Sequence, residues 1–216
     1  MKRTLFWSLV FYGISALGIS LTIKAAVGVS SFNSLNVSLS TITGIKVGTI
    51  TTAINLIFLV TCWGLDHGHK SRYQKWRNYL ILVVALLFFG NLVNGILYGV
   101  LPKLTLPNYA SQILCFTVGT LISGLATGQV SRLNHLKFPI ENFCQLMADR
   151  SRFSFKQYRY GIDVLCVLTS IGLSTVFSFP LVVREGTVIS LFLLSGAISW
   201  SRERSFSVRS KKQISQ

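Results

Sequence analysis

Acidic residues are scarce in this 216-residue chain, in which six Asp and Glu stand against 21 Lys and Arg. The chain has only three His and four Cys, and no two cysteines form a CxxC pair. It also lacks a nucleotide-binding glycine loop, a Ser-His-Asp set and a metal motif. We therefore expect neither an enzyme nor a bound metal or cofactor, and we expect no disulfide framework.

Long apolar stretches are what the chain does have, and 50% of its residues are hydrophobic. A bilayer core of about 30 Å requires ~20 apolar residues per helix, and hydrocarbon offers the backbone no hydrogen-bond partner. We therefore predict an all-α membrane protein with six transmembrane helices. The predicted spans are Leu5–Ile23, Val47–Gly64, Tyr79–Leu101, Ala110–Val130, Tyr160–Phe179 and Gly186–Trp200, the last being the shortest.

Basic residues are distributed unevenly among the segments that join these spans. With the N-terminus in the cytoplasm, 17 of the 21 Lys and Arg fall in cytoplasmic segments, and only Lys24, Lys46, Lys103 and Arg184 fall outside. Short loops rich in Lys and Arg stay cytoplasmic. We therefore predict a multi-pass plasma-membrane protein with both termini in the cytoplasm. Residues 1–200 would form the membrane domain and residues 201–216 a basic cytoplasmic tail.

The net charge of +15 raises nucleic acid as a partner. However, the charge is spread over four cytoplasmic segments instead of one patch. This distribution favours contact with anionic lipid headgroups over nucleic acid.

The two halves of the membrane domain, about 5–101 and 110–200, resemble each other. Because each half holds three spans, a direct repeat in the sequence would be inverted in the bilayer. This architecture is typical of secondary transporters, whose sites lie between the repeats. A duplicated membrane bundle without a transport role is the alternative. The matched positions are Gly13 and Gly18 with Gly119 and Gly124, 31–35 with 139–143, Thr51 with Arg159, 54–55 with 162–163, and Gly90 with Gly196.

A short non-spanning segment follows the first span of each half. Apolar residues recur there at spacings of three and four, which predicts a short helix with one apolar face. Ser30 or Ser31 is a candidate N-cap for the first helix, and Pro139 suits the first turn of the second. Both helices would be either amphipathic and surface-bound or re-entrant. The apolar positions are Phe32, Leu35, Leu39 and Ile42 in the first half and Ile140, Phe143 and Met147 in the second.

Ionisable residues inside membrane spans are costly and often functional, which makes Asp163 the leading candidate for a site. Arg159 lies one turn earlier on the same helical face, so a local ion pair near the cytoplasmic interface is the alternative. Asn55 occupies the position matched to Asp163, and Asn33 and Glu141 are matched to each other. The full set of candidate substrate-binding residues is Lys24, Asn33, Asn55, Asn91, Asn94, Arg132, Glu141, Arg159 and Asp163.

Four of these candidates also have a structural interpretation. Lys24 and Arg132 end the first and fourth spans, where long basic side chains extend to the headgroups. Turned inward, they would line opposite mouths of one pathway and favour an anionic solute. Asn91 and Asn94 share one helix face, where they either join helices through hydrogen bonds or line a polar site.

Three runs of residues resemble a known family. They are residues 18–33 (GISLTIKAAVGVSSFN), 43–49 (TGIKVGT) and 184–189 (REGTVI). These runs are similar to signatures of the YczE/YyaS/YitT-type bacterial membrane proteins. This chain has Ser31, Phe32 and Asn33 where those proteins often have Pro, Trp and Asp. The resemblance implies a small multi-span plasma-membrane protein of a kind described as a permease, without a settled biochemical activity.

These observations favour a small-solute permease as the function. The alternative is a non-transporting integral membrane protein that assists or scaffolds other proteins. Since 216 residues is short for a lone transporter, a homodimer is also expected.

Overall fold

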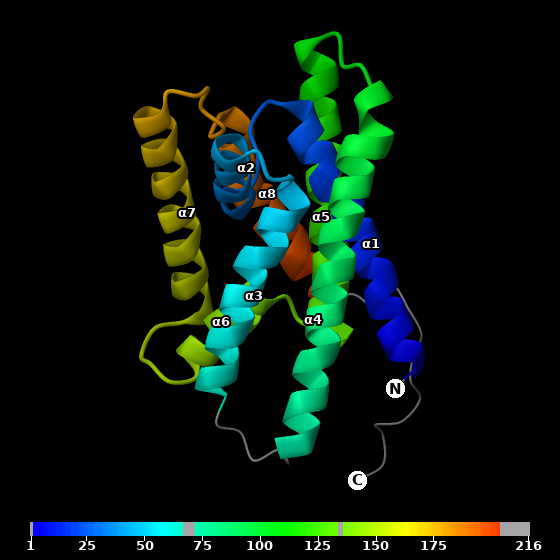
Figure 1. Ribbon diagram of the computed structural model, residues 1–216, viewed down its shortest axis with the longest axis vertical. Coiled ribbons are helices and arrows are strands. Elements are labelled where there is room, and N and C mark those ends of the chain that lie inside the picture. The colour runs from blue at the N-terminus through cyan, green and yellow to red at the C-terminus, as the bar shows by residue number, and fades with distance from the viewer. Residues whose placement is uncertain (1, 67–71, 134–135, 204–216) are drawn as a thin grey trace.

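The computed structural model describes residues 2–66, 72–133 and 136–203, and helices dominate it (Figure 1). No strand occurs within these ranges. The order of a long helix, a short helix and two long helices occurs twice. The first half has α1 (Lys2–Ala25), α2 (Ser31–Thr43), α3 (Val47–Leu65) and α4 (Arg72–Gly95), which continues through a π-helical turn at Ile96–Val100 and a 3-10 turn at Leu101–Lys103. The second half has α5 (Tyr109–Leu133), α6 (Pro139–Ala148), α7 (Phe155–Phe177) and α8 (Glu185–Glu203).

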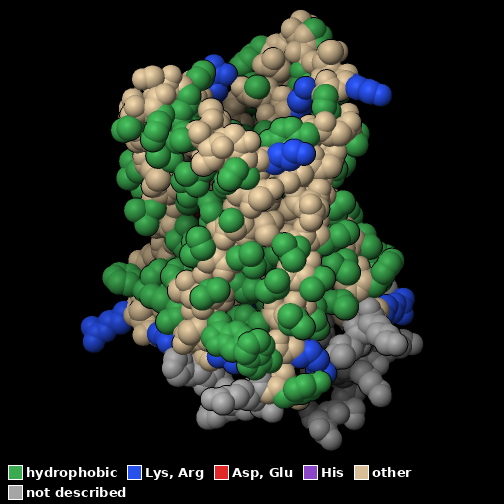
Figure 2. All heavy atoms as spheres, in the orientation of Figure 1, with side chains coloured by type: hydrophobic (Ala, Val, Ile, Leu, Met, Phe, Trp, Pro, Cys, Tyr) green, Lys and Arg blue, Asp and Glu red, His purple; other side chains and the backbone are tan. Residues whose placement is uncertain are grey.

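Five helical segments are long and apolar enough to cross a membrane, and they match the first five predicted spans. They are Arg3–Ala25, Val47–Leu65, Tyr73–Lys103, Tyr109–Leu133 and Phe155–Phe177. Hydrophobic side chains dominate the middle of the face in Figure 2, and Lys and Arg lie toward its two ends. The protein is therefore a multi-pass helical membrane protein. Helix α8 is not among the five segments, so they do not establish the predicted sixth span.

Small residues bring α1 and α5 into close contact at the centre of the fold. A Cβ added to Gly18 would lie 2.6 Å from the Gly119 carbonyl oxygen, so only glycine permits this approach. The Ser15 and Thr127 hydroxyls lie 3.2 Å apart across the same interface. Close approach through small residues and interhelical hydrogen bonds is how helices associate in membranes.

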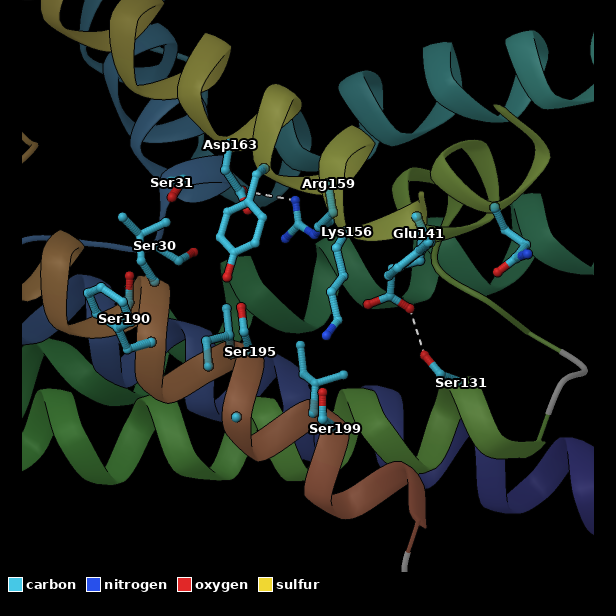
Figure 3. Close-up of a pocket in the computed structure, with 18 of the residues that line it drawn as sticks. Ser30, Ser31, Ser131, Glu141, Lys156, Arg159, Asp163, Ser190, Ser195 and Ser199 are labelled. Atoms are coloured by element: carbon cyan, nitrogen blue, oxygen red, sulfur yellow. Dashed lines mark hydrogen bonds and ion pairs between the residues drawn. The ribbon is translucent and has the colours of Figure 1, made fainter. Parts of the chain in front are cut away.

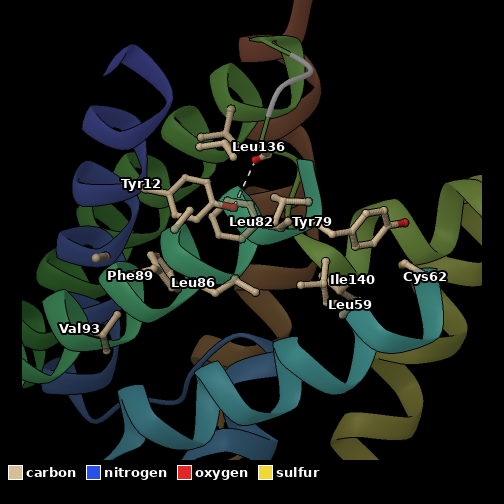
Figure 4. Close-up of a cluster of buried hydrophobic side chains, with 14 residues drawn as sticks. Tyr12, Leu59, Cys62, Tyr79, Leu82, Leu86, Phe89, Val93, Leu136 and Ile140 are labelled. Atoms are coloured by element: carbon tan, nitrogen blue, oxygen red, sulfur yellow. Dashed lines mark hydrogen bonds between the residues drawn. The ribbon is translucent and has the colours of Figure 1, made fainter. Parts of the chain in front are cut away.

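Aromatic packing joins α1 and α4 to the segment that leads into α6 (Figure 4). The fully buried Tyr12 ring stacks on Phe138 with ring centroids 4.5 Å apart, and it meets Phe89 edge to face at 5.5 Å. Its hydroxyl donates to the Leu136 carbonyl oxygen at 3.2 Å. Buried tyrosines require such a partner for the hydroxyl, so Tyr12 fixes this segment against the bundle.

The polar residues of α2 are turned inward. Ser34, Asn36 and Ser38 are fully buried, whereas Leu35 and Leu39 are partly exposed. The Ser38 hydroxyl lies 2.7 Å from the hydroxyl of Ser170 on α7. A helix bound to the membrane surface shows its polar face to water, and α2 has the reverse arrangement.

Both short helices contact the long helices of the opposite half. Helix α2 packs on α7 as well as α3, and α6 packs on α3 as well as α7. Pro139 begins α6 as predicted. Ser30 stands at the N-cap of α2, but its side chain accepts no hydrogen bond there, so the predicted side-chain cap is wrong.

The end of α1 meets the start of α8 through the backbone. Gly186 N donates to the Val27 carbonyl oxygen at 2.9 Å. Gly28 has a φ of +122°, and a Cβ there would lie 2.9 Å from Thr187 N. Two of the runs that carry the family resemblance therefore contact each other in the fold.

Helix α8 continues to Glu203 and so includes the first residues of the expected cytoplasmic tail. The remainder of the expected tail, 204–216, lies outside the described residues.

Candidate functional site

The protein has two adjoining cavities, of which the smaller lies between its two halves and the larger lies mostly within the second half. The larger, of about 430 Å³, separates α7 from α8 (Figure 3), and the smaller has about 80 Å³. Ligand sites typically have about 300–1,000 Å³, so the larger cavity is sufficient for a small molecule. The residues that line both cavities are Ser30, Glu141, Arg159, Leu194 and Ile198.

Helix α7 contributes Lys156, Arg159, Tyr160 and Asp163 to the larger cavity. Their spacing of three, four and seven residues places them on one helix face. Arg159 Nη1 lies 2.9 Å from Asp163 Oδ1, and the two side chains are 21% and 10% exposed. The predicted ion pair is thus confirmed, and it lies in the wall of a cavity.

Helix α8 presents small polar side chains to the same cavity. Ser190, Ser195 and Ser199 line it, and Figure 3 shows them across from Arg159 and Asp163. Ser190 is buried and donates to the Thr187 carbonyl oxygen at 2.8 Å, whereas Ser195 and Ser199 are exposed. Exposed hydroxyls on α8 can therefore contact a solute directly.

Helices α5 and α6 place an acidic group in the site. Glu141 lies in the first turn of α6, and its Oε2 accepts a hydrogen bond from the Ser131 hydroxyl at 2.6 Å. Because Lys137 also lines the larger cavity, the site contains both signs of charge. Its described lining has three cations, Lys137, Lys156 and Arg159, and two anions, Glu141 and Asp163.

The smaller cavity is lined by matched positions from the two halves. At the same offset as the aligned runs, Asn33 pairs with Glu141 and Thr51 with Arg159, and all four line this cavity. The buried Asn55 also lines it and donates from Nδ2 to the Thr51 carbonyl oxygen at 2.8 Å. Within the described chain, Asn55 Oδ1 has no hydrogen-bond partner.

The structure brings together five of the nine candidates predicted from the sequence. They are Asn33, Asn55, Glu141, Arg159 and Asp163, which come from four different helices. Lys137, Lys156 and Tyr160 also line the larger cavity and were not predicted. The spacing of Lys156 from Asp163, two helical turns on one face, was the signal that could have identified it.

The other four candidates do not line either cavity. Asn94 Oδ1 accepts from Gly48 N at 2.8 Å and its Nδ2 donates to Thr49 Oγ1 at 3.1 Å, so it joins α4 to α3. Asn91 is exposed and donates to the carbonyl oxygen one turn earlier. Lys24 lies in the last turn of α1, and Arg132 is exposed in the last turn of α5. The structure therefore favours a helix-joining role for Asn94 and helix-end positions for Lys24 and Arg132, whereas Asn91 bonds only within its own helix.

The cysteines and the acidic groups form no metal site in the described part of the chain. No group of three or more His, Cys, Asp and Glu is arranged to hold an ion there. All four cysteines are free thiols. The chemistry available to the cavities is therefore that of Lys, Arg, carboxylate, amide and hydroxyl groups.

Comparison with known proteins places the chain in a family. No solved structure matches it significantly. A protein of Bacillus subtilis (strain 168) described as "Uncharacterized protein YyaS" is 25% identical over 188 residues, which cover 85% of this chain and 87% of that protein. This similarity confirms the YyaS-type resemblance. The model of a family of unknown function, DUF6198, matches residues 1–203, and the chain therefore belongs to the DUF6198 family.

Proposed function

We propose that this protein is a small-solute permease of the cell membrane, and that the solute binds in the two adjoining cavities. The observation that carries the proposal is the collection of five charged side chains around one cavity of a membrane protein. Asp163 lies within a predicted span, where a carboxylate is expensive and typically marks the path of a solute or ion.

We also propose an inverted repeat of two three-span halves, which would fit this function. The smaller cavity is lined by matched residues of both halves, as expected of transporters with inverted repeats. Helices α1 and α5 occupy equivalent places in the repeat and run in opposite directions, because Ser15 is opposite Thr127 and Leu21 is opposite Cys115.

We propose α8 as the sixth span. It runs alongside α5 in the same direction, since Gly124 lies against Ala197 and Gly128 against Ser201. Its serines lower its hydropathy, but they face the cavity or α5 instead of lipid. The end of α8 also lies against α5, where Gln129 Nε2 donates to Ser201 Oγ at 3.0 Å.

With the predicted orientation, the larger cavity opens toward the cytoplasm in the described conformation. The larger cavity extends from Ser30 and Ser190 to Lys137 and Lys156, which belong to predicted cytoplasmic segments. Cysteines placed at Lys46 and Lys103 should react with an impermeant reagent in intact cells, while cysteines at Lys75 and Arg152 should not. The reverse labelling pattern would overturn this orientation in the plasma membrane.

The remaining expectations belong to the same proposal. The protein would have no enzymatic activity, would contact anionic headgroups through its cytoplasmic cations, would not bind nucleic acid and would function as a homodimer. The rival function, an accessory or scaffold protein, has one observation in its favour. Helices α7 and α8 do not pack against each other, so a partner helix could occupy the space between them.

Solute-dependent thermal stabilisation separates the two functions. A broad panel of solutes is added to purified protein in detergent, and the substrate of a permease should raise the unfolding temperature because it binds the folded state. Arg159→Gln should abolish this response, whereas Arg132→Gln, outside the cavities, should preserve it. Stabilisation by a co-purifying protein and by no solute would support the scaffold instead.

A further inference from the structure

Two helices begin in the interior of the protein without side-chain caps. Ser31, the first residue of α2, is 3% exposed, and Ile140 in the first turn of α6 is 6% exposed. Neither N-cap residue, Ser30 nor Phe138, accepts a hydrogen bond from its helix through a side chain. By contrast, α7 begins at the surface with a complete capping box of Ser154 and Gln157.

Both uncapped helix starts line the smaller cavity. Helix α2 contributes Ser30, Phe32 and Asn33, and helix α6 contributes Phe138, Ile140 and Glu141. First-turn N–H groups have no acceptor within their own helix, and the helix dipole makes this end positive. Arg159 lines the same cavity, so this part of the site favours an anionic group, as helix N-termini do elsewhere.

A second observation indicates that the solute also carries a hydrogen-bond donor. Asn55 is 2% exposed, lines the same cavity, and its Oδ1 has no partner in the described chain. The amide orientation is fixed, because Nδ2 donates to a carbonyl oxygen that can only accept. Asn36 Oδ1 also lacks a partner but lines neither cavity. A solute that carries a donor can satisfy an acceptor left in a buried cavity.

We infer that the solute is a small zwitterion, with its carboxylate at the first turns of α2 and α6 beside Arg159 and its ammonium group against Asn55 Oδ1 and Glu141. This inference rests on the proposed permease function and specifies its substrate class. A simple anion would bring no donor to Asn55 Oδ1, and a simple amine would bring no acceptor to the first-turn N–H groups of α2 and α6. The small volume of the inner cavity, about 80 Å³, favours the smaller zwitterions.

Three probes that share parts of one structure test the inference on the purified full chain in detergent. Alanine carries both charged groups, propionate carries the carboxylate alone, and ethylamine carries the ammonium group alone. Alanine should raise the unfolding temperature, and the other two should need at least about tenfold higher concentrations for the same shift. O-phosphoethanolamine, which has the zwitterionic chemistry of a lipid headgroup, is the fourth probe.

Two variants identify the groups that recognise the ammonium. Asn55→Leu keeps a similar shape and removes the acceptor, and Glu141→Gln keeps the shape and removes the charge. Each should weaken the response to alanine at least about tenfold and leave the weak response to propionate unchanged. Both variants are judged only if they unfold cooperatively without solute, and Glu141→Gln preserves the test if Asn55→Leu does not fold.

The outcomes separate failure of this inference from failure of the permease proposal. Equal stabilisation by propionate or ethylamine, or a stronger response to O-phosphoethanolamine, would overturn the small carboxylate zwitterion. No response to any of the four probes would overturn it too. In that case a response to another solute from the broad panel would leave the permease intact, and a complete lack of responses would count against both.

Discussion

Helices α3 and α4 pack in direct backbone contact, whereas their counterparts α7 and α8 stand apart with the larger cavity between them (Figure 1). A Cβ added to Gly90 would lie 1.9 Å from Thr52 Oγ1, and one added to Gly48 would lie 2.1 Å from the Gly90 carbonyl oxygen. A Cβ added to Gly196, the match of Gly90, would meet nothing within 4 Å. One pair of helices is closed and the other leaves room for a solute.

The residues at the matched positions account for this difference. At the offset that pairs Thr51 with Arg159, Gly48 matches Lys156 and Thr52 matches Tyr160. Small residues let helices approach closely in a membrane, while a lysine and a tyrosine hold them apart. The same substitutions that prevent close packing of α7 and α8 also supply part of the polar lining of the larger cavity.

The largest effect should come from adding a side chain to the closed pair. Gly90→Val would force α3 and α4 apart, and overpacking of this kind typically costs about 1–3 kcal/mol and occasionally more. We expect a loss of at least about 3 kcal/mol, because both Thr52 Oγ1 and a backbone oxygen stand in the way. Unfolding in detergent measures the loss.

Gly196→Val is the matched control for this substitution. It places the same side chain at the matched position of the open pair, where nothing lies within 4 Å. The stability should change by less than about 0.5 kcal/mol, as at surface positions. Equal destabilisation by the two substitutions would show that α7 and α8 also pack closely in solution.

The sequence predicted the helices well because their information is local. Length and hydropathy locate the spans, and spacing of apolar residues locates both short helices. The separation of α7 and α8 was not predictable in this way. Lys156 and Tyr160 indicate it only when the two halves are aligned and these residues are compared with the small residues Gly48 and Thr52. The missing cap on α2 was likewise not predictable, because Ser30 has the right side chain, and only the tertiary position of that helix start leaves the cap unused.

The next effect concerns the charges that distinguish α7 from α3. Asp163→Asn removes the carboxylate from Arg159, and hydrogen bonds to charged groups contribute about 1.5–3 kcal/mol. We expect a stability loss in that range with the fold retained. The double variant Arg159→Gln with Asp163→Asn leaves no uncompensated charge and should recover most of the loss. Additive losses in the double-mutant cycle would mean that the ion pair is not coupled.

A bulky residue in the open pair should abolish binding without unfolding the protein. Gly196→Trp would fill the larger cavity, and Gly172→Trp adds the same ring to an exposed position on α7 that lines neither cavity. We expect both variants to stay within about 1 kcal/mol of the parent, as substitutions at uncrowded positions do. Only Gly196→Trp should lose stabilisation by solute. If both respond to solute as the parent does, binding occurs elsewhere.

The smallest effect is one of chemical reactivity, and it tests the comparison without disturbing the fold. A cysteine at Ser195, which is exposed in the open pair, should react with a maleimide at pH 7.5, whereas one at Thr52 should be protected because Thr52 is buried in the closed pair.

The native Cys144 provides an internal reference, since burial raises the pKa of its thiol to about 11. That pKa lies above the usual value, so at pH 7.5 this thiol stays almost wholly protonated, and the thiolate is the reactive form. We expect Ser195→Cys to be labelled at least about tenfold faster than Cys144, and Thr52→Cys to be no faster than Cys144. Rapid labelling of Thr52→Cys would show that α3 and α4 also separate in solution. The closed pair would then be one conformation of a moving interface instead of a fixed framework.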